Sequence, residues 1–197
     1  MQRRWAVGCM LAALAGAASS SNADDPPRVQ RADPPRTITD FELTDQNGKP
    51  RRFSALRGAP VLVFFGFAHC PDVCPTALNQ LRLLRASGDK DARRAEVVII
   101  SVDGERDSPA AMKAFLDPIS ADFVGLTGPA GRVRDIAAQF SAVFFKGLPQ
   151  GKSAGYRVDH TGQVYLVDKA GRLRATFFNA PVETLQTFTA KIARERL

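Results

Sequence analysis

Apolar residues along the chain fall into short runs that are typical of strands. Residues 61–65 and 96–102 are rich in β-branched and aromatic side chains, and they predict strands that are buried on both faces in the middle of an α/β sheet. Residues 164–167 and 173–178 flank a turn at residues 168–171 and predict a hairpin. These four segments predict the centre of one sheet.

A second spacing, with apolar residues three or four positions apart, predicts amphipathic helices. One would bury Ala77, Leu78, Leu81 and Leu84 and stop at Gly88. Ser108-Pro109 forms a suitable N-cap and first position for the next. Two more helices are expected, one over residues 133–140 and one that begins near Pro181.

Shorter segments complete the predicted fold. Residues 123–126 and 143–145 are short strand candidates. Asn47-Gly48, inside residues 41–53, predicts a hairpin because this dipeptide tolerates the positive φ of a tight turn. We therefore predict an α/β sandwich in which helices flank a mixed central sheet, with an N-terminal hairpin.

The N-terminal residues have a different composition. Arg3 and Arg4 precede an apolar run that ends in small residues, so residues 1–23 are predicted to be a signal peptide, with a short membrane anchor as the alternative. Residues 24–36 are rich in proline and charge and are predicted to form an extended tether. The folded domain is expected to span residues 37–197.

Charge narrows the choice of partners. The 197-residue chain has a formal charge of +7, and cleavage after Ala23 would leave 25 basic and 20 acidic residues. No block of Lys and Arg interleaved with aromatic residues is present, so nucleic acid is not an expected partner. An acidic protein, an anionic membrane surface or simply a solvated basic face remain the interpretations.

Cleavage would also remove Cys9 and leave two cysteines, Cys70 and Cys74. A disulfide between them would close almost no loop and would stabilise the fold little, so we expect a chemical role for the pair. Residues four apart on a helix share one face, which allows either a disulfide or the binding of one ion. Cys74 is predicted at the N-cap before Pro75, where the helix dipole would favour its thiolate.

Two thiolates and an imidazole form a soft ligand set that suits copper. The chain has two histidines, and His69 is the poorer candidate because adjacent residues in an extended segment point to opposite faces. His160 is expected in a loop before a strand, as the third ligand or as a partly buried hydrogen-bonding residue. Asp159 could orient the imidazole, although an aspartate in a loop more often forms a turn. The charged loop 103–107 could form the rim of the site or pair internally.

Four segments resemble the Sco/SenC family of thioredoxin-like copper chaperones for cytochrome c oxidase assembly. They are FGFAHCPDVCP (residues 65–75), SVDGERDSP (101–109), FSAVFFK (140–146) and YRVDHTGQVYLVD (156–168). The resemblance implies a thioredoxin-like domain that binds one copper ion through Cys70, Cys74 and His160. It also implies an extracytoplasmic location, in a bacterium the periplasm, either free or tethered to the inner membrane.

From the resemblance we expect a carrier without catalytic turnover, which holds Cu(I), with Cu(II) as a second state. The implied recipient is the dinuclear copper site of cytochrome c oxidase subunit II, and other copper chaperones or thiol reductants are further expected partners. The alternative is a thiol-disulfide oxidoreductase in which Cys70 and Cys74 are the redox-active pair. A copper or redox sensor is a third hypothesis.

Overall fold

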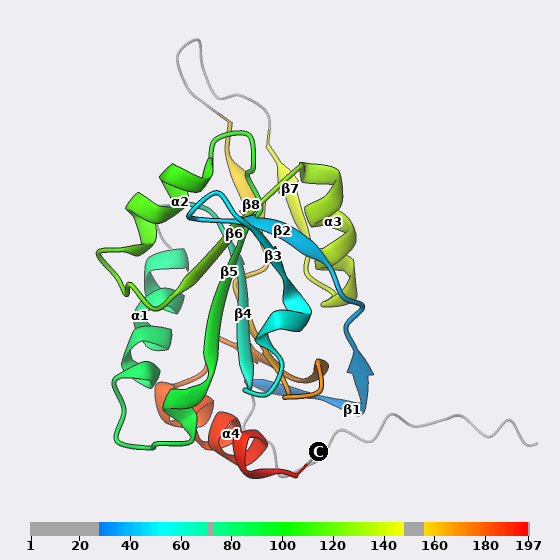
Figure 1. Ribbon diagram of the computed structural model, residues 1–197, viewed down its shortest axis with the longest axis vertical. Coiled ribbons are helices and arrows are strands. Elements are labelled where there is room, and N and C mark those ends of the chain that lie inside the picture. Colours follow the sequence, from blue (N-terminus) through cyan, green and yellow to red (C-terminus); the bar gives the residue numbers. More distant parts are fainter. Residues whose placement is uncertain (1–27, 71–72, 148–155, 197) are drawn as a thin grey trace, which may run out of the picture.

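The computed structural model describes residues 28–70, 73–147 and 156–196. In this part of the chain, eight strands form one sheet in the order β1-β10-β9-β4-β5-β6-β2-β3, and β7 pairs with β8 in a separate two-stranded sheet (Figure 1). The strands are β1 (Val29–Thr37), β2 (Glu42–Asp45), β3 (Pro50–Arg52), β4 (Val61–Gly66), β5 (Glu96–Ser101), β6 (Val124–Thr127), β7 (Phe144–Lys146), β8 (Val158–His160), β9 (Gln163–Val167) and β10 (Arg172–Phe178). The helices are α1 (Val73–Arg85), α2 (Pro109–Leu116), α3 (Ala130–Gln139) and α4 (Val182–Arg194), with 3-10 turns η1 (Phe53–Leu56) and η2 (Ala92–Arg94).

Strand β4 is the centre of the sheet. It pairs in parallel with β5 on one side and antiparallel with β9 on the other, and every one of its residues is buried. This confirms the prediction from its continuous apolar run. The predicted hairpins β2–β3 and β9–β10 are confirmed too, with positive φ angles at Gly48 (76°) and Gly171 (87°) in their turns.

Helices cover both faces of the sheet. Figure 1 shows α1, α2 and α4 on one side and α3 on the other. The predicted apolar face of α1 is buried, and on the opposite side Phe140, which follows α3, packs edge-on against Phe65 with ring centroids 5.4 Å apart. Ser108 caps α2 by accepting a hydrogen bond from the Ala111 N–H, as predicted. The α/β sandwich with a mixed sheet is confirmed.

The prediction of a tether over residues 24–36 requires correction. Residues 1–27, which include the predicted signal peptide, lie outside the described residues, but Val29–Thr37 forms edge strand β1 against β10. Its register shifts between Arg31 and Arg36, around Pro34 and Pro35. Proline is tolerated at sheet edges and bulges, so an extended proline-rich segment can pair with a sheet without burying much of itself.

The segment around His160 also differs from the prediction. His160 was expected in a loop, but it is the last residue of β8, which pairs with β7 in register Phe144 to His160. Strand β7 corresponds to the predicted run 143–145, yet Val143 and Phe145 are exposed. A pattern of apolar residues does not distinguish a buried strand from one in an exposed hairpin.

Among the described residues, no helix has the length and apolar character to span a membrane.

Candidate metal centre

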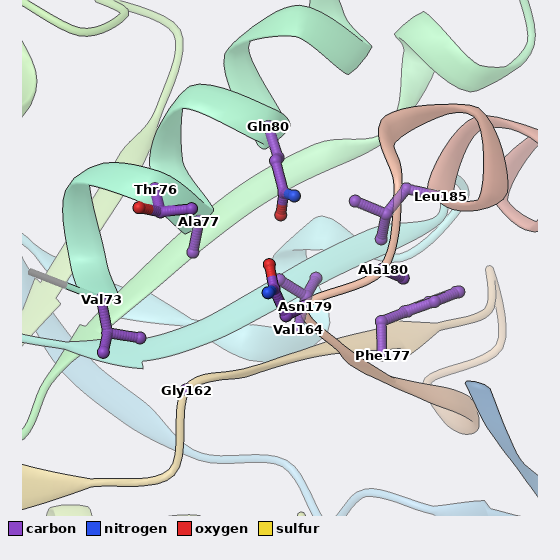
Figure 2. A pocket seen from close by; sticks show the side chains of 10 residues that line it. All are labelled: Val73, Thr76, Ala77, Gln80, Gly162, Val164, Phe177, Asn179, Ala180 and Leu185. Carbon is purple, nitrogen blue, oxygen red and sulfur yellow. The ribbon is translucent and has the colours of Figure 1, made fainter. Parts of the chain in front are cut away.

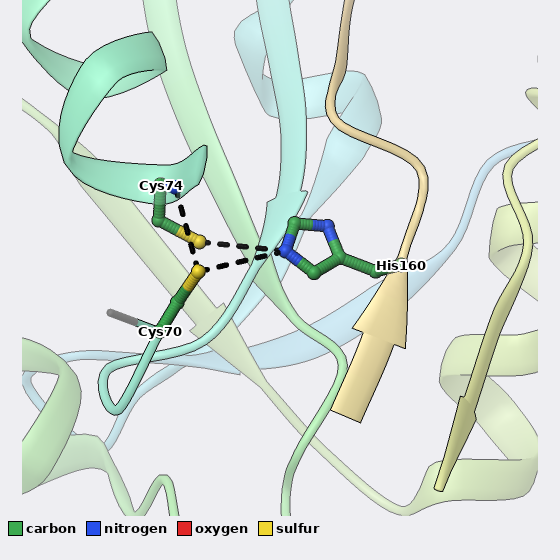
Figure 3. Close-up of side chains that lie close together, drawn as sticks. All are labelled: Cys70, Cys74 and His160. Carbon is green, nitrogen blue, oxygen red and sulfur yellow. Dashed lines mark hydrogen bonds between the residues drawn. The ribbon is translucent and has the colours of Figure 1, made fainter. Parts of the chain in front are cut away.

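Three side chains from separate parts of the chain meet at one end of the main sheet (Figure 3). Cys70 follows β4, Cys74 lies in the first turn of α1, and His160 ends β8. The Nε2 atom of His160 is 3.8 Å from Sγ of Cys70 and 3.6 Å from Sγ of Cys74. All three potential ligand atoms lie within 4.8 Å of one another, and no other such group occurs in the described part of the chain.

These separations match the requirements of one shared ion. An ion bonded at about 2.3 Å to sulfur and about 2.0 Å to nitrogen, with about 120° between the bonds, separates the two ligand atoms by about 3.7 Å. The observed distances of 3.6 and 3.8 Å are close to this value. Both cysteines are free thiols, so their sulfur atoms are available. The two sulfur-to-nitrogen distances are therefore those expected when the three side chains share one ion.

The two cysteines have different surroundings. Cys74 is completely buried, whereas Cys70 is half-buried. The backbone N–H of Cys74 donates to Sγ of Cys70 at 3.4 Å. An N–H in the first helical turn has no partner within the helix, so the sulfur of Cys70 provides one.

This arrangement corrects the prediction for Cys74. Helix α1 begins at Val73, which places Cys74 inside the first turn and not at the N-cap. Burial raises the pKa of the Cys74 thiol, and the hydrogen bond and charge of Cys70 raise this pKa further. The predicted stabilisation of a Cys74 thiolate by the helix terminus is therefore outweighed by desolvation in the protein without a metal ion.

Aromatic rings hold the imidazole of His160. The rings of Phe64 and Phe67 pack edge-on against it, with centroids 5.9 Å and 5.6 Å away. Burial lowers the pKa of His160, which favours the neutral ring. Its Nδ1 atom lies 3.2 Å from the carbonyl oxygen of Thr161, and a proton donated there leaves the lone pair of Nε2 directed at the two sulfur atoms.

The other two residues considered from the sequence do not join this group. His69 is exposed, and its Nδ1 atom lies 3.5 Å from Oδ1 of the buried Asp107. Asp159 lies 3.7 Å from the guanidinium of Arg157. The atom that contacts Nδ1 of His160 is the Thr161 carbonyl, which no side-chain pattern in the sequence could have indicated.

Within the charged loop 103–107 only Asp103 and Arg106 pair with each other, and Glu105 and Asp107 contact residues outside it. Asp103 accepts hydrogen bonds from Arg106 and from the hydroxyl of Tyr156. Asp107 accepts from the Ala68 N–H at 3.0 Å and from the Ser101 hydroxyl at 2.7 Å, and so fixes the segment that leads to Cys70. The loop thus holds in place the backbone segment that leads to Cys70.

Tyr156 was not identified from the sequence as part of the site, and Arg106 was included only as one residue of the charged loop 103–107. The guanidinium of Arg106 lies over the ring of Tyr156, 4.1 Å from its centroid. Burial and the hydrogen bond to Asp103 raise the pKa of Tyr156 to about 12, so its hydroxyl remains a donor. For Tyr156 the signal available in the sequence was only that it lies in a segment that resembles the family.

Two cavities meet at Val73. The first, of about 400 Å³, is lined by side chains of the metal centre and of strand β8. The second, of about 270 Å³, lies between α1 and the segments around Gly162 and Asn179, and contains no residue of the cysteine-histidine group (Figure 2). The metal centre can therefore be reached from solvent through the first cavity, beside Cys70 and His160.

Comparison with known proteins agrees with this geometry. The family model described as SCO1/SenC matches residues 29–195. A SCO2-like protein of Rickettsia conorii is 33% identical over 149 residues, which cover 75% of this chain and 73% of the relative. The residues matched by the family model include both cysteines and the histidine of the group.

Two solved structures carry copper in the same fold. The copper-bound ScoI of Bradyrhizobium japonicum is 37% identical, with a TM-score of 0.70 over 79% of this chain and 99% of that structure. Copper-bound yeast Sco1 is 28% identical, with a TM-score of 0.73 over 83% and 91% of the two chains. The predicted thioredoxin-like fold is thereby confirmed. The chain belongs to the SCO1/SenC family.

Proposed function

We propose that this protein is a copper metallochaperone that binds one copper ion through Cys70, Cys74 and His160. The observation that carries the proposal is the spacing of the two sulfur atoms around Nε2 of His160, 3.8 and 3.6 Å. Two thiolates and one imidazole suit Cu(I), and the same set can hold Cu(II). The copper bound to two family members of known structure supports the choice of ion.

The function includes delivery of the ion. The recipient is the dinuclear copper site of cytochrome c oxidase subunit II, and transfer proceeds by ligand exchange. The half-buried Cys70 supports this role, because an incoming ligand can approach the copper from its side while Cys74 and His160 keep hold of it. Residues 1–23 direct the chain across a membrane as a signal peptide or short anchor, so that the domain works in the periplasm.

Copper titration of the reduced chain under anaerobic conditions tests the site. Wild type should bind one copper per chain, and the double variant Cys70→Ser/Cys74→Ser should bind none. His160→Ala should retain copper at least about 100-fold more weakly, because loss of a ligand should exceed the loss of a residue that only supports a ligand. His69→Ala, at the only other histidine, is the matched control and should retain copper like wild type. Equal retention in wild type and His160→Ala would exclude the proposed site.

A second candidate function is thiol-disulfide exchange. It is favoured by the asymmetry of the pair, because Cys70 is accessible and accepts an N–H bond whereas Cys74 is buried behind it. The Cys70 thiolate would attack a partner's disulfide, and Cys74 would then displace the partner's second thiol. The partner gains two electrons and two protons, and Cys70 and Cys74 become a disulfide.

Substitution of His160 distinguishes the copper-carrying function from thiol-disulfide exchange. Thiol-disulfide exchange with a model disulfide peptide should proceed in His160→Ala at a rate close to that of wild type. Cys74→Ser should stop the reaction at the mixed disulfide with Cys70, which mass spectrometry would detect. A protein that carries copper but shows no exchange would support the chaperone function alone.

A further inference from the structure

The hairpin that carries His160 is not part of the main sheet. In the described part of the chain, β7 and β8 pair with each other and with no strand of the eight-stranded sheet. The backbone hydrogen bonds of the main sheet hold β9, which starts three residues after His160, but they do not hold β8 itself. Side-chain contacts between this hairpin and the rest of the domain therefore contribute to the distance of His160 from Cys70 and Cys74.

Arg106 makes several of these contacts. Its guanidinium donates to the Asp103 carboxylate and, at 3.3 Å, to the backbone carbonyl of Tyr156, two residues before β8 begins. It also lies over the ring of Tyr156 at 4.1 Å, while Tyr156 donates its hydroxyl to the same Asp103. The carboxylate is buried, so this group of three residues is tightly packed at the end of β5.

The β7 strand is connected to the same residues. The Nζ atom of Lys146 lies 3.7 Å from the ring centroid of Tyr156 and 2.6 Å from the carboxylate of Glu105, which is the neighbour of Arg106. Both strands of the hairpin are thus joined to the loop that follows β5. The Lys146 to Glu105 pair is exposed and contributes little by itself.

Phe67 completes the connection from Arg106 to the imidazole. The guanidinium of Arg106 lies 5.8 Å from the centroid of the Phe67 ring, which packs edge-on against His160 at 5.6 Å. Arg106 therefore contacts both the segment that leads into β8 and one of the two rings that hold His160.

We propose that Arg106 is a positioning residue, which sets the distance of the His160 imidazole from the two sulfur atoms and so the geometry of the bound copper. The inference rests on the proposed copper site. A planar guanidinium can donate to Asp103 and Tyr156 at once and lie on two rings, which an ammonium cannot do. Loss of a residue that bonds directly to a metal ligand typically weakens metal binding by about 10-fold to 100-fold, and Arg106, which acts through Phe67 and Tyr156, should lie at the lower end of this range.

The test compares Arg106→Ala and Arg106→Lys with wild type, each as the full chain loaded with copper(II) chloride. Two properties are measured: the electron paramagnetic resonance and thiolate-to-Cu(II) absorption spectra, and the rate of copper loss to a chelator. Both variants should show altered spectra and copper loss faster by about 10-fold. The spectra report on the bound ion itself, so a mere loss of fold stability would leave them unchanged. The Arg106→Lys variant keeps the positive charge, and it provides the test if Arg106→Ala does not fold.

Arg194→Ala is the control, because Arg194 is an exposed arginine that also bonds two carboxylates, those of Asp89 and Asp91. It should leave the spectra and the rate as in wild type. Wild-type spectra and rate in a folded Arg106 variant would overturn the inference. If wild type itself binds no copper, the proposed function fails instead, and the two failures are distinguishable.

Discussion

Gly66, at the end of β4, leaves the space that the sulfur of Cys74 occupies. A Cβ atom on Gly66 would lie 3.0 Å from Sγ of Cys74 and 2.6 Å from Cε1 of Phe64. Both neighbours are completely buried, so neither can move without disturbing the core. The absence of a side chain at this one residue is therefore a condition for Cys74 to lie beside His160.

We predict that Gly66→Ala lowers the free energy of unfolding by about 1–3 kcal/mol through overpacking. The displaced sulfur should also weaken copper retention. Urea denaturation and anaerobic copper titration measure the two effects. Gly88→Ala is the control, since no heavy atom lies within 4 Å of the Cβ position there. A Gly66 variant as stable as the Gly88 variant would show that the core adapts easily.

At the scale of elements, the connection from β8 to β9 touches the start of α1. A Cβ atom on Gly162 would lie 2.5 Å from Cγ1 of Val73 but 3.9 Å from its Cβ atom. Gly162 follows His160 by two residues, and Val73 precedes Cys74. Contact between these two residues thus sets how closely the hairpin approaches the helix that carries the buried cysteine.

Gly162→Ala should therefore push the hairpin away from α1, destabilise the fold by about 1–3 kcal/mol and weaken copper retention. Val73→Ala removes the clashing methyl group, so the double variant Gly162→Ala/Val73→Ala should recover most of both losses. A double-mutant cycle of unfolding free energies measures this coupling. Additive effects of the two substitutions would show that the contact does not set the spacing.

At the scale of the whole molecule, Asp168 joins the β9–β10 hairpin to the C-terminal helix. Its carboxylate accepts the N–H groups of Ala170 and Arg172 at 3.0 and 2.9 Å and contacts the guanidinium of Arg174 at 3.3 Å. Arg174 also donates to Glu195, just after α4, at 2.6 Å. This group lies at the far end of β9 from His160.

Burial of Asp168 would raise its pKa, but the hydrogen bonds from Arg172 and Ala170 outweigh burial and hold this pKa below its usual value. The carboxylate therefore stabilises the fold above the unfolded-state pKa of about 3.9, and this stabilisation is lost as the pH falls toward the folded-state pKa. Asp168→Asn should be less stable than wild type at neutral pH, and the difference should shrink below about pH 4.

Urea denaturation over a series of pH values measures this difference. Asp117→Asn is the control, because Asp117 forms an exposed pair with Lys113 and its loss should change stability little. A difference between Asp168→Asn and wild type that stays constant down to about pH 3 would contradict the prediction.

The local pattern of the sequence determined most elements of the fold. The apolar run of β4, the helical spacing of Leu78, Leu81 and Leu84, and the turn at Asn47-Gly48 each predicted the observed structure. Such features depend on backbone preferences and on burial patterns within about a dozen neighbouring residues, so they are present in the sequence itself. The pairing of Cys70 with Cys74 is local in the same sense.

Tertiary contacts decided the rest. Only the folded chain brings His160 within 3.8 Å of the sulfur of Cys70, and only packing buries Cys74 so that its pKa is raised despite its place in the first turn of a helix. The pairing of Val29–Thr37 with β10 and the group around Arg106 likewise join segments far apart in sequence. Distance and desolvation depend on which segments meet, and no local pattern specifies that.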